Sequence, residues 1–170
     1  MSDAERFQAQ LLAESLSGVA GVEVYPVDVD AACREYLEEG YEVTPWLQEF
    51  LANYGECIVT WQFRGSDTSV STRVEHALEA PHATPRNMQI FSRRLGLATL
   101  PIGSAFSTEE CMLLAANGDI LLAGDPGFQW VAHGFHAAAH ALVAGPWDRT
   151  FYTIAPAEDG LRERLTQAES

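Results

Sequence analysis

The sequence predicts an α+β protein of one domain, with helices packed on a central sheet that is mostly antiparallel. Helical and strand-like patterns occur in runs rather than in regular alternation, which is typical of antiparallel sheets. The apolar stretch at about 100–124 is interrupted by Asn117-Gly118, a pair that favours the tight turn of a β-hairpin. A length of 170 residues suits one domain with a sizeable core.

The N-terminal third predicts three helices and one short extended segment. The helices are expected at 3–17, 31–39 and 46–54, and the extended segment at 22–27. Asp30 is a suitable N-cap for the second helix, and Thr44-Pro45 combines a cap with a proline at the first helical position. Tyr36 and Leu37 are expected on the buried face of the second helix.

The rest of the chain predicts strands followed by a last helix. Strands are expected at 57–63 and 69–78, a helix at about 85–95, the hairpin at about 100–124 and a helix at about 130–144. The β-branched and aromatic residues of 57–63 favour a strand. Thr84-Pro85 repeats the helix start signal. Asp125-Pro126-Gly127 is expected to end the hairpin.

The charge of the chain excludes several classes of partner. With 24 Asp+Glu against 10 Lys+Arg, the net charge is −14, and all ten basic residues are arginine. Such a surface repels nucleic-acid phosphates and anionic membranes and attracts a basic protein. No signal peptide or membrane span is visible, and three cysteines without a Cys-x-x-Cys pair indicate a reducing compartment. We therefore expect a cytoplasmic protein that binds neither nucleic acid nor membrane.

Few residues indicate catalysis. His133, His136 and His140 have near-helical spacing and are a candidate metal site, but they lack the Glu of a His-Glu-x-x-His motif. We favour the interpretation that these histidines pack on a helix and have no chemical role. A metal-binding protein or enzyme that uses them remains the alternative. Cys57 and Cys111 are expected to be buried apolar residues rather than nucleophiles. The sequence thus predicts no enzyme activity, no catalytic residue and no cofactor.

Protein recognition is the function that remains. Trp46 and Trp61 are expected in the core. The candidate partner-binding residues are carboxylates in acidic clusters and two tryptophans that follow turns. They are Glu35, Glu38, Glu39, Glu42, Glu109, Glu110, Asp125, Trp130 and Trp147.

One stretch resembles a known family. The residues LPIGSAFSTEEC from Leu100, and NGDILLAGDPGFQWVAHGFHAAAHALVAG from Asn117, are similar to the third branch of the SUKH (SMI1/KNR4-like) superfamily. The resemblance covers roughly 25–152. It divides the chain into an N-terminal helix and lead-in at 1–24, a SUKH-like domain at 25–155 and a polar tail at 156–170.

The resemblance implies a fold and a function. The fold is α+β, with helices on one side of a central sheet. The function is that of a bacterial immunity protein, which binds and neutralises a cognate toxin, often a nuclease or a deaminase. A regulatory protein-interaction scaffold is a second alternative, since eukaryotic relatives act in this way. The oligomeric state stays open.

Overall fold

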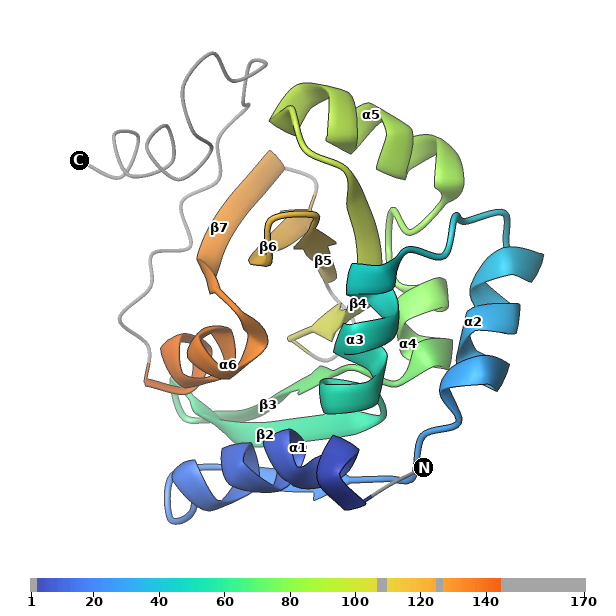
Figure 1. Cartoon of the computed structure of the whole chain (residues 1–170). Coiled ribbons are helices and arrows are strands. Elements are labelled where there is room, and N and C mark those ends of the chain that lie inside the picture. Colours follow the sequence, from blue (N-terminus) through green and yellow to red (C-terminus); the bar gives the residue numbers. More distant parts are fainter. Residues whose placement is uncertain (1–2, 107–109, 125–126, 145–170) are drawn as a thin grey trace.

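The computed structural model describes residues 3–106, 110–124 and 127–144, which form six helices and one seven-stranded antiparallel sheet (Figure 1). The helices are α1 (Asp3–Ser15), α2 (Val29–Glu38), α3 (Pro45–Tyr54), α4 (Val74–Glu79), α5 (Pro85–Leu95) and α6 (Phe135–Ala144). The strands are β1 (Gly21–Val24), β2 (Cys57–Phe63), β3 (Ser66–Ser71), β4 (Thr99–Ala105), β5 (Glu110–Ala115), β6 (Asp119–Gly124) and β7 (Gly127–His133). The predicted α+β class is confirmed.

The sheet is strongly curved, and its strands lie side by side in chain order from β1 to β7 (Figure 1). Helix α6 lies within the curve and contacts both β7 and β2. Every residue of β4 and β5 is buried, so both faces of the sheet centre are covered. This is a more enclosed arrangement than the one-sided helical layer that the resemblance implied.

The predicted hairpin turn is present between β5 and β6. Gly118 has a φ of +94°, which glycine adopts without strain, and the Asn117 side chain accepts a hydrogen bond from the Asp119 N–H at 3.0 Å. The apolar stretch nevertheless contains three strands rather than two, because β4 is separate and pairs with β5. The hairpin prediction is therefore confirmed, and its first strand is shorter than expected.

The Thr-Pro start signals are also confirmed. The Thr44 hydroxyl accepts a hydrogen bond from the Leu47 N–H, and the Thr84 hydroxyl accepts one from the Asn87 N–H. Helix α2 begins two residues earlier than predicted. Its N-cap is Asp28, which accepts from the Ala31 N–H, and Asp30 lies inside the first turn.

The strand predicted over 69–78 is wrong in its second half. Strand β3 ends at Ser71 and α4 begins at Val74. No local side chain caps this helix. Instead the carboxylate of Glu56 accepts a hydrogen bond from the Val74 N–H at 2.7 Å and pairs with Arg73 at 3.4 Å. The helix start is therefore satisfied by a residue 18 positions away, which local pattern does not reveal.

Glu56→Ala is expected to lower the free energy of unfolding by about 1–2 kcal/mol, the usual effect of losing a helix cap. Urea denaturation followed by circular dichroism measures this loss. Glu79→Ala, which removes an exposed glutamate at the other end of α4, is the matched control. Equal losses in the two variants would show that Glu56 does not cap the helix.

The helix predicted over 130–144 is wrong in its first part. Residues 127–133 form β7, which pairs with β6, and α6 begins only at Phe135. The chain turns between them at Gly134, whose φ is +86° and whose N–H donates to the Gly118 carbonyl at 2.9 Å. His133 therefore ends a strand and does not share a helix with His136 and His140.

Candidate protein-recognition surface

Residues 28–49 carry many exposed carboxylates. Seven carboxylates and one arginine, Arg34, lie in this range, and all eight side chains are exposed. The carboxylates belong to Asp28, Asp30, Glu35, Glu38, Glu39, Glu42 and Glu49. Six of the chain's 14 net negative charges thus come from α2, the following loop and α3. Charges gathered in this way attract a basic partner more strongly than the same number spread evenly.

An exposed leucine lies on the same helix as several of these carboxylates. Leu37 is 58% exposed, whereas its neighbour Tyr36 is fully buried and donates a hydrogen bond to the Pro101 carbonyl at 2.6 Å. This bond fixes the rotation of α2, so that Leu37 faces outward and the prediction of a buried Leu37 is wrong. The exposed Arg34 lies one turn before Leu37. Exposed apolar side chains near charged ones are common in protein interfaces. We call Leu37 with Glu35, Glu38, Glu39 and Glu42 the α2 surface.

The predicted partner-binding residues lie in different parts of the structure, and only some of them are exposed. Four of the carboxylates, Glu35, Glu38, Glu39 and Glu42, are exposed along α2 and the loop that follows. Glu110 is only 7% exposed in β5, so it is not available to a partner and its assignment is corrected. Trp130 is half-buried in β7, and its indole nitrogen is enclosed. Glu109, Asp125 and Trp147 lie outside the described residues.

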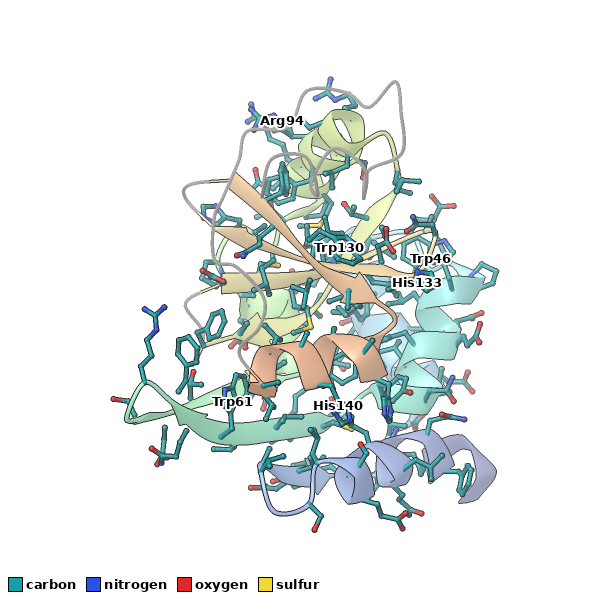
Figure 2. All side chains as sticks on the ribbon, turned by 90° about the vertical axis from the view of Figure 1, so that its left-hand side faces the viewer. Trp46, Trp61, Arg94, Trp130, His133 and His140 are labelled. Carbon is teal, nitrogen blue, oxygen red and sulfur yellow. The ribbon has the colours of Figure 1, made fainter. Side chains whose placement is uncertain are left out.

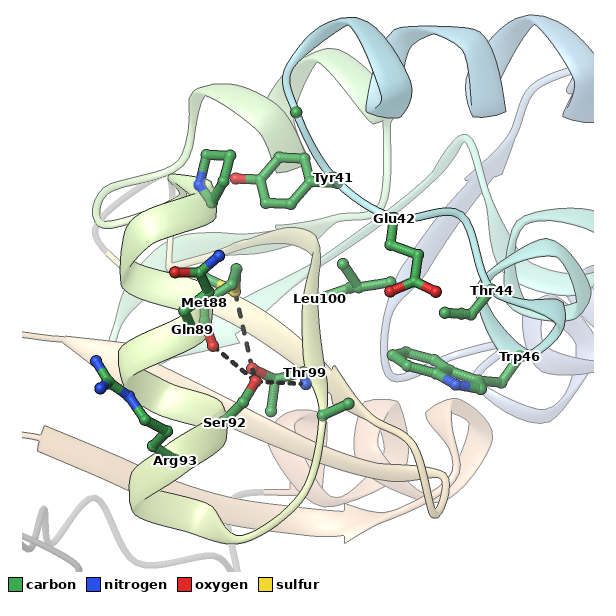
Figure 3. A pocket seen from close by; sticks show the side chains of 13 residues that line it. Tyr41, Glu42, Thr44, Trp46, Met88, Gln89, Ser92, Arg93, Thr99 and Leu100 are labelled. Atoms are coloured by element: carbon green, nitrogen blue, oxygen red, sulfur yellow. Dashed lines mark hydrogen bonds between the residues drawn. The ribbon is translucent and has the colours of Figure 1, made fainter.

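A groove of about 560 Å³ adjoins this surface, between the α2–α3 loop and α5 (Figure 3). Trp46 and Leu100 provide apolar lining, Glu42 lies on the loop side, and Arg93 lies on the α5 side. Trp46 is half-buried rather than part of the closed core, while Trp61 is buried as predicted. Sequence patterns did not reveal the groove, because its two walls are about 45 residues apart in the chain.

The hydroxyls on the α5 side of the groove are already bonded. Ser92 donates to the Met88 carbonyl at 2.6 Å, and the Thr99 N–H donates to the Ser92 hydroxyl at 3.0 Å. In the described part of the chain, the side chains of Glu42, Gln89 and Arg93 make no hydrogen bond or ion pair. These three side chains are therefore polar groups of the groove that are left without a partner in the described chain.

The three histidines do not converge on one point. His133 Nδ1 lies 2.9 Å from the buried carboxylate of Asp119. The rings of His136 and His140 stack at 4.9 Å, and His140 Nε2 lies 2.7 Å from the Ser15 hydroxyl (Figure 2 shows His133 and His140 apart). Within the described residues, no group of three or more His, Cys, Asp or Glu side chains is placed to hold a metal ion.

Acid is expected to destabilise the protein through His136. Burial lowers the pKa of His136 from the usual 6.5, and His140 lowers it further. The unfolded chain therefore takes up a proton at a higher pH than the folded one, so stability falls as the pH drops below about 6.5. Urea denaturation at about pH 7.5 and about pH 5.5 should show a smaller loss for His136→Gln than for the natural chain. The same loss in both proteins would contradict this assignment.

Cys57 and Cys111 are buried, as predicted. Cys111 is fully buried and burial raises the pKa of its thiol to about 12, while burial also raises the pKa of Cys57. Both thiols therefore stay protonated at neutral pH, and the nucleophile in cysteine chemistry is the thiolate.

The described residues form an α+β domain with many exposed carboxylates beside a groove. The model of the SUKH-3 immunity protein family matches residues 15–145, and the chain belongs to this family. Comparison with curated proteins and with solved structures gave no match. Among the described residues, no helix has the length and apolar character needed to cross a membrane.

Proposed function

We propose that this protein neutralises a cognate toxin by binding it one-to-one through the α2 surface. The observation that carries the proposal is the exposed Leu37 on a helix with several exposed carboxylates, in a member of an immunity protein family. Leu37 supplies the apolar contact, and the carboxylates attract and orient a basic toxin. The protein covers the working surface of the toxin and performs no chemistry of its own.

The toxin is proposed to act on nucleic acid, as a nuclease or a deaminase. Enzymes that bind nucleic acid present arginine and lysine to the phosphates. Carboxylates pair with the same side chains through charge-assisted hydrogen bonds. The exposed glutamates of the α2 surface then occupy positions that phosphates take in the substrate complex, which blocks the substrate from entering.

Binding and protection can be tested with a nuclease or deaminase toxin domain from the same genome. Co-expression of this protein with the toxin domain should suppress the lethality of the toxin. Native mass spectrometry of the two purified proteins should give a one-to-one complex. Leu37→Ala is expected to weaken binding about tenfold or more. Glu35→Gln with Glu38→Gln should slow association and flatten its salt dependence.

Glu14→Gln, an exposed glutamate on α1, is the matched control and should leave binding unchanged. If the α2 variants change toxin binding no more than Glu14→Gln does, the α2 surface is not the interface. Specific binding to a protein that is not a toxin would favour the regulatory scaffold. Stoichiometric metal in the purified protein would favour the histidine alternative.

A further inference from the structure

We infer that the groove beside the α2 surface is an arginine-binding subsite for the partner, with Trp46 as its floor and Glu42 as its counter-ion. This inference rests on the proposed function, because it names the side chain by which the toxin is held. It goes beyond that function by placing a specific recognition element between the α2–α3 loop and α5.

Glu42 and Trp46 both line the groove on the side of the α2–α3 loop. The Glu42 carboxylate points toward the indole of Trp46 (Figure 3), and it makes no hydrogen bond or ion pair within the described chain. A guanidinium between them would stack on the indole and pair with the carboxylate. Arginine suits this place better than lysine, because its planar group stacks and donates two parallel hydrogen bonds.

The wall of the groove contains an unsatisfied hydroxyl. Tyr41 is 95% buried, and its hydroxyl has no hydrogen-bond partner among the described residues. A buried hydroxyl without a partner costs free energy, which a ligand can recover by supplying one. Tyr41 lines the groove and its enclosed hydroxyl points toward α5 (Figure 3), so a small opening of the groove on binding would let a backbone carbonyl of the bound segment accept its hydrogen bond.

The shape and charge of the groove also suit an arginine on an extended segment. A volume of about 560 Å³ exceeds what one side chain fills, so the arginine is expected to arrive on an extended segment. Leu100 and Met88 provide apolar contact for the arginine's methylene groups and for its neighbours in that segment. Arg93 lies on the far side of the groove from Glu42. Its positive charge repels the guanidinium of the bound arginine and so favours the end of the groove at Glu42 and Trp46.

Two peptides of matched shape provide the test. The first is an acetylated and amidated pentapeptide with a central arginine between leucines, and the second replaces the arginine by citrulline, which has the same shape without the charge. Each is titrated into the full-length ¹⁵N-labelled protein. The indole N–H signal of Trp46, assigned with Trp46→Phe, and the amides of residues 40–42 and 88–93 report binding.

The arginine peptide is expected to shift these signals and to bind about fivefold or more tightly than the citrulline peptide. Glu42→Gln should remove that difference, whereas Glu49→Gln on α3 should keep it. Equal binding of both peptides, tighter binding of a central-glutamate peptide, or shifts confined to other residues would overturn the inference. The spectrum of each variant shows whether it is folded.

The toxin complex separates this inference from the proposed function. If Glu42→Gln and Trp46→Phe leave toxin affinity unchanged while Leu37→Ala weakens it, the subsite is wrong and the proposed function stands. If the chain binds the arginine peptide at the groove but neutralises no toxin, the subsite stands and the proposed function is wrong.

Discussion

Arg6→Met is expected to lower the free energy of unfolding by about 2–4 kcal/mol, because it leaves three carbonyls without their donor. The Arg6 guanidinium is buried and donates to the carbonyls of Ala52, Tyr25 and Gly55 at 3.1, 3.1 and 2.7 Å. It joins α1 to the segment after β1 and to the end of α3. Methionine keeps much of the volume, so the loss reports the hydrogen bonds rather than a cavity.

Urea denaturation measures this loss, and Arg34→Met provides the matched control. Arg34 is exposed on α2, and its substitution is expected to change stability by less than about 0.5 kcal/mol. Arg6→Lys should recover only part of the loss, because an ammonium lacks the fixed spacing of the two guanidinium nitrogens. A stable Arg6→Met variant would mean that the three carbonyls find other donors.

Gly103→Ala is expected to destabilise the protein by more than about 3 kcal/mol, since the new Cβ has no space. It would lie 2.2 Å from the backbone carbonyl oxygen of Ser71. That carbonyl belongs to the short β3–β4 pairing, where Ser71 lies opposite Ser104. Because both colliding groups are tied to the backbone, the strands must separate, and the two parts of the sheet lose their connection.

Gly21→Ala is the control for this substitution. Its added Cβ would have only the Thr60 carbonyl at 4.0 Å, which is ordinary contact. Thermal unfolding should show a large decrease in Tm for Gly103→Ala and little change for Gly21→Ala. Similar Tm values for the two variants would show that β3 and β4 do not approach as closely as described.

Local signals in the sequence were sufficient where the interaction itself is local. Asn117-Gly118 and Thr84-Pro85 determine a turn and a helix start through hydrogen bonds that span two or three residues. The sequence failed where the partner is distant. Glu56 caps α4 from 18 positions away, and β7 is a strand because β6 offers it a pairing edge. By its pattern alone, the short apolar run at 127–133 is compatible with a helix or a strand, and pairing with β6 makes it a strand.

Only part of the candidate surface could be predicted, because the rest depends on interactions between distant parts of the chain. Charge counting identified Glu35, Glu38, Glu39 and Glu42, because exposure of a carboxylate is the ordinary case. It did not identify Leu37, because the rotation of α2 is set by the Tyr36 bond to Pro101, which spans 65 positions. It also placed Glu110 on the surface, although β5 lies at the centre of the sheet.

The strand order has a consequence for how quickly the sheet can form. Each strand pairs with the one that precedes it in the chain, so every addition to the sheet extends an edge that has already formed. Sheets built from such sequential pairings have lower contact order and fold faster than sheets whose neighbours are far apart in sequence. A sheet with this strand order can grow from its N-terminal end while the chain is being synthesised.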